Sequence, residues 1–313
     1  MPAWDYDIVI VGAGPAGLTA GIYAGRARLK TLLLEKLIHG GQVMTTDLVE
    51  NYPGFPEGIS GFELSDRMRK QAERFGLEFR SGEVLELVPG PDHHLLRLEG
   101  EELRAGAVII ASGAGYKKLG APGEKEFTGK GVSYCATCDG ALYKGDTIAV
   151  VGGGDTALTD TVFLSRFAEK IHLIHRRDSF RGEKVLQEQI FALQKEKKVE
   201  IHWDTVVKEI QGTQAVETIQ LRNVKTKELS SLPVAGVFIF VGIVPNTAWL
   251  HDRVPLDEWG FIFTNAQMAT SVPGIFAAGD VRNKLLRQIA TAVGDGATAA
   301  FFAGSYLDEQ RSR

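Results

Sequence analysis

Short apolar runs rich in β-branched residues recur along the chain, and the first of them opens a compact unit. Residues 7–11 form such a run, a glycine-rich turn follows at 12–17, a helical pattern covers 18–29, and a second apolar run occupies 31–34. This order of strand, glycine turn, helix and strand predicts a βαβ unit whose two strands are parallel.

The same unit recurs in the middle of the chain. An apolar run at 147–151 leads into a glycine turn at 152–157, a helical pattern covers 158–168, and a further apolar run spans 171–174. The spacing from the first glycine to the residue that ends the second strand is the same in both units. Two equally spaced units predict two dinucleotide-binding folds in one chain.

Glycine and proline divide the chain at two places, 113–123 and 242–247. We therefore expect a discontinuous first domain, residues 1–115 with 247–313, and a second domain inserted in it at 116–246. Further strands, expected at 108–110, 237–241 and 275–278, end in small residues, as strands do at the cofactor edge of an open sheet. The predicted fold class is α/β, with two Rossmann-like three-layer dinucleotide-binding domains.

The composition adds limits on function. The chain has 313 residues, 44% hydrophobic and 24% charged, with a formal net charge of −4. These values are ordinary for a soluble protein and argue against a nucleic-acid or membrane surface. The apolar stretch Val234–Val244 is too short to cross a bilayer. Because the first residues carry acids where a signal peptide carries bases, we expect a cytoplasmic protein.

Each glycine turn suits a pyrophosphate. The first glycine permits the tight turn, the second lets the backbone approach the phosphates, and a third small residue lets the helix pack on the strand. The N-terminus of the helix then faces the phosphates with free N–H groups. The expected ligands are Gly12, Gly14, Pro15, Ala16 and Gly17 in the first unit and Gly152, Gly154, Asp155, Thr156 and Ala157 in the second.

The two units end with opposite chemistry. Glu35 ends the first and can accept hydrogen bonds from a ribose with free hydroxyls, as in FAD or NAD. The second unit ends in His175, Arg176 and Arg177, with Arg181 close behind. Arginine forks match a phosphate, so this unit should prefer the 2′-phosphate of NADPH. The alternative is a solvated basic strand end.

Asp280 follows the apolar run 275–278 at an expected cofactor edge. Its carboxylate is suited to a sugar or ribitol hydroxyl. The alternative, which is compatible with the first, is that it caps the next helix.

The two cysteines, Cys135 and Cys138, form a Cys-x-x-Cys pair. In a cytosolic protein this spacing is typical of a redox-active dithiol, whereas structural zinc needs about four ligands. A coincidental buried pair is the alternative. Asp139 adjoins the pair and is suited to move a proton to or from a thiol, unless it only opens the turn at Gly140.

Together these motifs resemble the low-molecular-weight thioredoxin reductases, which are FAD- and NAD(P)-dependent pyridine nucleotide-disulfide oxidoreductases. The resemblance covers nearly the whole chain, and residues 135–140 and the arginine motif are its most specific parts. It implies FAD contacts beyond the first glycine turn and Glu35. They are expected from Gly41, Gln42, Asn51, Ala111, Gly113, Gly279, Asp280, Arg287 and Gln288.

The resemblance also implies a homodimeric flavoprotein that passes hydride from NADPH through FAD to the Cys135–Cys138 disulfide and on to thioredoxin or a thioredoxin-like protein. Cys138 would lie against the flavin and Cys135 would be the interchange thiol, although either sulfur can meet the partner. The cysteines and the NADPH motif share one domain, so that domain would swing between the two half-reactions on the linkers at 113–123 and 242.

Some positions depart from the family pattern. Asp155 stands where Asn or Ser is frequent, and 159–161 lacks the usual glutamates. Asp155 puts a negative charge near a pyrophosphate site, so we expect these departures to affect nucleotide affinity and the preference for NADPH over NADH.

Four other functions fit these motifs less well. A flavin dithiol oxidase needs no nucleotide-phosphate motif, and a flavin-dependent ferredoxin reductase needs no Cys-x-x-Cys. A redox-sensing binding module would not sustain turnover. A peroxiredoxin-reducing relative needs an additional N-terminal disulfide domain.

Overall fold

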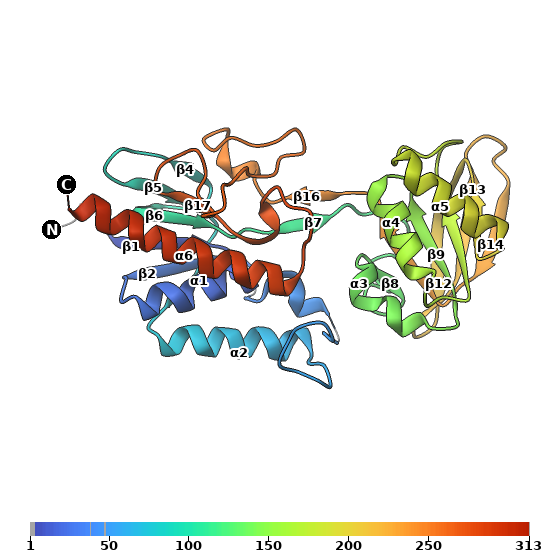
Figure 1. Ribbon diagram of the computed structural model, residues 1–313, viewed down its shortest axis with the longest axis horizontal. Helices are drawn as coiled ribbons and strands as arrows, with labels where there is room; N and C mark the ends of the chain where they lie inside the picture. Colours follow the sequence, from blue (N-terminus) through green and yellow to red (C-terminus); the bar gives the residue numbers. More distant parts are fainter. Residues whose placement is uncertain (1–3, 38, 47, 313) are drawn as a thin grey trace. The chain divides into compact units, whose positions relative to one another are not determined.

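The computed structural model describes residues 4–37, 39–46 and 48–312, which form two compact units (Figure 1). Unit 1 consists of the chain up to Gly115 together with Val244 onwards, and unit 2 is the continuous stretch Tyr116–Ile243. Within the described residues, no helix is both long and apolar enough for a bilayer crossing.

Unit 1 is built on a sheet whose central strands are buried and parallel. β1 pairs with β2 on one side and β6 on the other, and β3 and β17 extend the parallel part. β4 and β5 continue the sheet as antiparallel strands. The strands are β1 (Tyr6–Val11), β2 (Thr31–Glu35), β3 (Glu78–Ser81), β4 (Glu86–Val88), β5 (His94–Leu98), β6 (Glu101–Ile110) and β17 (Ile275–Ala277).

Helices cover one face of this sheet. α6 packs on α1 closely because Gly296 has no side chain: a Cβ there would lie 2.1 Å from the carbonyl oxygen of Ala16. α2 completes the apolar layer. The other face forms a second apolar cluster, to which β4, β5 and the loops near 250–262 contribute. The helical segments are α1 (Pro15–Arg26), η1 (Gly41–Thr45), α2 (Gly61–Arg74), η3 (Ala248–Leu250), η4 (Gly279–Val281) and α6 (Ile289–Arg311).

Unit 2 has a five-stranded parallel sheet in the order β11-β10-β9-β15-β8. Helices pack on one face, and an antiparallel sheet of β12, β13 and β14 packs on the other. The elements are β8 (Val132–Ser133), α3 (Ala136–Asp139), η2 (Gly140–Tyr143), β9 (Thr147–Gly152), α4 (Asp155–Leu164), β10 (Lys170–Ile174), α5 (Lys184–Lys195), β11 (Val199–His202), β12 (Thr205–Gly212), β13 (Val216–Asn223), β14 (Leu229–Pro233) and β15 (Gly236–Phe240). The layered α/β class predicted from the sequence is confirmed, with one unit inserted in the other.

The chain crosses between the units twice, and the two crossing segments pair with each other. β7 (Ala114–Tyr116) and β16 (Ile243–Pro245) form a two-stranded sheet. Ser112 and Asn246 extend the pairing, because each side chain donates a 2.8 Å hydrogen bond to the other's backbone carbonyl. The two linkers are thus one paired connection rather than two independent tethers.

Candidate active site

The first glycine turn lies between β1 and α1 and is held by backbone contacts. Gly12 has φ +108°, and a Cβ on Gly17 would lie 1.9 Å from the carbonyl oxygen of Gly12. By contrast, a Cβ on Gly14 would meet no atom within 4 Å. Gly14 caps α1 without a side-chain hydrogen bond, and Pro15 and Ala16 begin the helix. The turn therefore leaves an open cradle above a helix N-terminus, which fits a pyrophosphate.

Glu35, at the end of β2, braces this turn. Its Oε2 accepts a 2.8 Å hydrogen bond from the backbone of Ala13, and its Oε1 accepts one of 3.0 Å from Leu37. An ionised carboxylate offers about four lone-pair sites, and the two contacts with described residues use only part of them, so the group can also accept from ribose hydroxyls.

One loop expected at the flavin, the loop with Gly40 and Gly41, lies against the same turn. The backbone N–H of Gly40 donates to Ala13 at 2.7 Å, and the Cβ position of Gly41 is 3.3 Å from Gly14. Gln42 follows in η1.

Asn51 and Gln288 meet although they lie far apart in the sequence. The Asn51 amide donates a 3.0 Å hydrogen bond to Oε1 of Gln288. Gln288 also begins α6 in a capping box with Thr291. The Asn51 loop is therefore tied to the N-terminus of α6.

The ends of three parallel strands bring the remaining predicted FAD residues to one edge. Ala111, which lies two residues before Gly113, donates a backbone hydrogen bond to the carbonyl of Val11. Ala278, which directly precedes Gly279, donates one to the carbonyl of Ile110. The Cβ position of Gly279 lies 2.9 Å from Cβ of Ala16, so this edge meets the start of α1.

Asp280 has a buried acceptor that suits a cofactor hydroxyl. Its Oδ1 is buried and has no hydrogen-bond partner among the described residues. Burial raises the pKa of this carboxyl, and the neighbouring Lys284 and Arg287 oppose the rise. A buried acceptor without a partner is costly. A hydroxyl of a bound FAD would satisfy it.

Asp295 is a positioning residue that the sequence reasoning missed. Its carboxylate accepts a 3.0 Å hydrogen bond from the backbone of Gly279 and pairs with Arg282 at 2.8 Å and Lys284 at 2.7 Å. It thereby fixes the segment that carries Asp280. Arg287 contributes from the other side, because its Nε donates to the Asp280 carbonyl at 3.4 Å. An acid near the start of the Ala- and Gly-rich α6 was the available signal.

The second glycine turn, between β9 and α4, has the same open form. A Cβ on Gly152 would lie 2.5 Å from Cβ of Ala157, whereas one on Gly154 would meet only a guanidinium nitrogen of Arg181, at 3.5 Å. Gly154 caps α4 without a side-chain hydrogen bond, and Asp155 and Thr156 begin the helix. The cradle and the adjacent arginine fit a dinucleotide phosphate.

Asp155 has a structural partner that the sequence did not reveal. Its Oδ1 accepts a 2.7 Å hydrogen bond from the backbone of Glu183, the residue that caps α5. Backbone N–H groups of Arg181 and Gly182 donate to Gly153. Asp155 thus holds the Arg181 loop against the glycine turn.

His175 is buried, unlike the three arginines near it. Its Nε2–H donates to the carbonyl of Ser179 at 3.0 Å, and burial lowers its pKa. The ring lies under the glycine turn, since a Cβ on Gly153 would be 2.3 Å from it. The exposed residues with a positive charge here are Arg176, Arg177 and Arg181.

Cys135 and Cys138 form a disulfide at the start of α3. Cys135 caps the helix, and its Sγ accepts a 3.2 Å hydrogen bond from the backbone N–H of Cys138. The Thr137 hydroxyl lies 3.5 Å from the same sulfur. After reduction, such donors stabilise a thiolate on Cys135.

Ser133 connects Asp139 to the disulfide. Its hydroxyl donates to Oδ2 of Asp139 at 2.5 Å and accepts a hydrogen bond from the backbone of Cys135 at 3.1 Å. Burial and then the Asp139 carboxylate raise the pKa of the nearby Tyr143 to about 12, so this phenol stays protonated. Ser133 was missed from the sequence, where a hydroxyl two residues before the cysteines was its only signal.

A layered α/β fold with two open glycine turns and a Cys-x-x-Cys disulfide is typical of a dinucleotide-dependent disulfide oxidoreductase. Residues 6–296 match the family described as pyridine nucleotide-disulphide oxidoreductase, and the chain belongs to this family.

Several relatives are similar over almost the full length. The thioredoxin reductase of Bacillus subtilis (strain 168) is 47% identical, with 97% of this chain and 95% of the relative covered. That of Listeria innocua is 46% identical over 97% and 94%. The crystal structure of thioredoxin reductase from Streptococcus pyogenes has a TM-score of 0.93 at 45% identity, covering 97% of this chain and 98% of the other. The family resemblance predicted from the sequence is confirmed.

Members of this family use FAD and NADPH, and the chain is therefore an FAD- and NADPH-dependent oxidoreductase, as the sequence predicted. The residues present fit both groups. Asp280 has a buried acceptor that a cofactor hydroxyl would satisfy, and both glycine turns are open where phosphates would approach.

Proposed function

We propose that this chain is a disulfide reductase that carries electrons from NADPH to thioredoxin or a thioredoxin-like protein. The observation that carries the proposal is the Cys135–Cys138 disulfide beside an acid–base candidate, Asp139, in a chain nearly half identical to enzymes named thioredoxin reductase.

In this proposal the discontinuous domain, 1–115 with 247–313, binds FAD and the inserted domain, 116–246, binds NADPH. Bound NADPH and FAD supply the electron pair that opens the Cys135–Cys138 disulfide. Glu35 and Asp280 would hold FAD hydroxyls, and the first glycine turn would hold its pyrophosphate. Arg176, Arg177 and Arg181 would hold the 2′-phosphate of NADPH.

The second half of the reaction is thiol–disulfide exchange by the chain's own residues. The Cys135 thiolate attacks one sulfur of the partner's disulfide, forms a mixed disulfide and releases the partner's other sulfur as a thiolate. The Cys138 thiolate then attacks Cys135, which re-forms the Cys135–Cys138 disulfide and frees the second partner sulfur. Asp139, oriented by Ser133, moves the proton between these sulfurs and solvent.

The reaction also requires the inserted domain to change its orientation. The proposed NADPH residues and the cysteines both belong to that domain, yet each must approach the same flavin in turn. The described chain passes between the two units at the paired strands β7 and β16, so rotation would occur there.

We further propose a cytoplasmic homodimer. A dithiol that must be regenerated in every cycle suits a reducing compartment. The exposed aromatic side chains Phe62 and Phe301, 61% and 63% exposed, favour packing against a second copy. Light scattering of the purified protein should give the mass of two chains, and a monomer would contradict the proposal.

The function is tested by purifying the yellow holoenzyme and following NADPH oxidation with oxidised thioredoxin. Sustained turnover is expected, together with rapid anaerobic bleaching of the flavin by NADPH. Bleaching without thioredoxin turnover would exclude the proposal and favour a redox-sensing module, whereas a flavin that NADPH does not bleach would favour a dithiol oxidase.

Alanine at Arg176, Arg177 or Arg181 should raise KM for NADPH and leave KM for NADH unchanged. Each guanidinium can form a charge-assisted hydrogen bond to the 2′-phosphate, so a rise of roughly tenfold or more is expected for each. Arg222→Ala removes an exposed arginine of the same unit and serves as the control. No change in KM for either nucleotide would argue for a solvated basic strand end, and an equal rise for both would contradict recognition of the 2′-phosphate.

Asp155→Asn should tighten NADPH binding by about fivefold, because it removes roughly one charge's worth of repulsion near the phosphates. The Asn oxygen can still accept from Glu183, so the Arg181 loop keeps its position. Asp155→Ala removes both the charge and the hydrogen bond and should bind less tightly than Asp155→Asn. Fluorescence titration of NADPH checks this order, and equal affinities would show that the loop contact is unimportant.

A further inference from the structure

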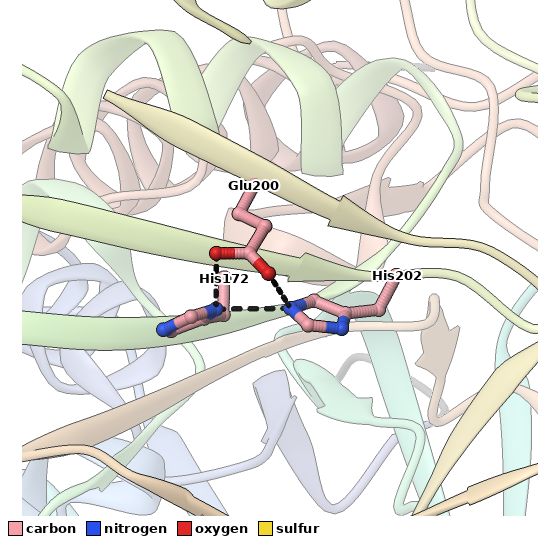
Figure 2. Close-up of side chains that lie close together, drawn as sticks. All are labelled: His172, Glu200 and His202. Atoms are coloured by element: carbon pink, nitrogen blue, oxygen red, sulfur yellow. Dashed lines mark hydrogen bonds and ion pairs between the residues drawn. The ribbon is translucent and has the colours of Figure 1, made fainter. Parts of the chain in front are cut away.

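Two imidazoles and a carboxylate meet on one face of the parallel sheet in unit 2 (Figure 2). His172 lies on β10, and its register partner on β11 is Glu200. His202 lies two residues after Glu200 and therefore points to the same side of the sheet. Leu173, which follows His172 on β10, packs in the apolar cluster on the helix side of the sheet. Because side chains alternate along a strand, His172, Glu200 and His202 lie on the opposite side.

The three groups converge on one point. Nδ1 of His172 and Nε2 of His202 are 2.9 Å apart. Glu200 directs one oxygen at each ring: Oε2 lies 3.8 Å from the His172 nitrogen and Oε1 lies 3.7 Å from the His202 nitrogen. A hydrogen-bonded pair of imidazoles would need only the two rings. A hydrogen bond between the two rings does not explain why the Glu200 carboxylate faces both nitrogens.

The separations are close to those of a metal site, and a tetrahedral ion would move the two nitrogens apart by about 0.5 Å. Two nitrogens, each 2.0–2.1 Å from one ion and at right angles, are about 2.9 Å apart, and at the tetrahedral angle they are about 3.4 Å apart. The carboxylate would have to move closer by less than about 1 Å to join them. The side chain of Glu200 is 49% exposed and has the freedom to do so.

We propose that His172, Glu200 and His202 bind a divalent transition-metal ion, for which we commit to Zn²⁺, with water in the remaining coordination positions. Two imidazoles and one carboxylate form a ligand set that suits zinc and its neighbours, whereas magnesium and calcium require oxygen ligands. The site uses no cysteine and is separate from the residues proposed to bind NADPH.

Both imidazole rings are shielded from solvent. The side chain of His172 is 8% exposed and that of His202 is 19% exposed. Neutral imidazole is the form that binds zinc.

One cation opposes the metal. Lys170 forms a 2.5 Å ion pair with Oε2 of Glu200, and this contact is the largest cause of the lowered pKa of Glu200. The metal has to replace this ammonium group. Removal of Lys170 should therefore strengthen metal binding, an effect opposite in sign to removal of a ligand.

The site would join the outermost strand, β11, to its neighbour β10. Directly beyond it, the backbone of His175 donates a 3.0 Å hydrogen bond to His202. Trp203 follows His202, and its ring lies 6.1 Å from that of His175. Metal binding would thus be reported by a tryptophan, and it would stiffen the strand ends near the nucleotide motif.

The experiment is a calorimetric titration of the oxidised holoenzyme with ZnCl₂. The Cys135–Cys138 disulfide is kept intact so that no thiol competes for the metal. The wild type should bind one zinc ion per chain through this cluster, and Glu200→Gln and His202→Ala should each weaken that binding at least tenfold. Lys170→Met should tighten it severalfold, and His251→Ala, an exposed histidine of unit 1, should change nothing.

A second readout guards against misfolded variants. Zinc should raise the thermal unfolding midpoint of the wild type, as any ligand of the folded state does. The rise should be absent in Glu200→Gln, whose half-exposed side chain keeps its size. The proposal is overturned if the wild type takes up no zinc at saturation, or if Glu200→Gln and His202→Ala bind zinc as tightly as the wild type.

Discussion

Serine at either Cys135 or Cys138 will abolish thioredoxin reduction, a fall of roughly 10³-fold or more, because a hydroxyl can neither form nor re-form the disulfide. Anaerobic bleaching of the flavin by NADPH will persist, since no cysteine takes part in nucleotide binding. Steady-state turnover with thioredoxin and a stopped-flow bleaching experiment measure the two effects separately. Thr137→Ala removes only a hydroxyl 3.5 Å from Sγ of Cys135 and keeps both cysteines, so it should lower turnover far less than either serine variant.

The same variants assign roles to the two sulfurs. With Cys138→Ser, Cys135 remains and should trap the partner as a stable mixed disulfide that denaturing electrophoresis detects without reductant. Cys135→Ser should trap no partner if Cys135 is the interchange thiol. Unchanged thioredoxin turnover in either variant would refute the proposed relay, and trapping by Cys135→Ser alone would reverse the two roles.

Asp139→Asn should lower thioredoxin turnover by about 10²-fold, the lower range for loss of a general acid–base group. The amide keeps the shape of the side chain and can still accept the hydrogen bond from Ser133. It can no longer exchange a proton with a thiol or thiolate. The fall should appear in kcat with thioredoxin and not in KM for NADPH.

Ser133→Ala separates orientation from proton transfer. This change removes the 2.5 Å hydrogen bond to Asp139 but leaves the carboxylate in place. Its effect on kcat should be several times smaller than that of Asp139→Asn. If Asp139→Asn stays within twofold of the wild type, Asp139 merely opens the turn at Gly140.

The sequence predicted the glycine turns well and the helix limits less well. Helices were expected at 18–29 and 158–168, whereas α1 spans Pro15–Arg26 and α4 spans Asp155–Leu164. In both cases the residues assigned to the phosphate turn also form the first turn of the helix. The phosphate motif and the helix start are the same piece of backbone, so the apolar pattern alone placed the helices three residues late.

Other parts of the fold had no local signal. No sequence motif marks the antiparallel layer of β12, β13 and β14. Its strands are largely half exposed or exposed, and the layer covers one face of the parallel sheet. Asn51 with Gln288, and Asp295 with Gly279, meet only after distant segments pack together. Such contacts depend on tertiary structure, and no spacing rule in one sequence reveals them.

The insertion of unit 2 within unit 1 has a consequence for biosynthesis. α6, at the C-terminal end of unit 1, packs on α1, which follows the first strand. Because domains fold as units while the chain is made, the continuous stretch Tyr116–Ile243 is complete and can fold before α6 emerges from the ribosome. Unit 1 therefore begins to be synthesised first and is completed last. The face of α1 that packs on α6 stays uncovered by it while residues 116–243 are translated.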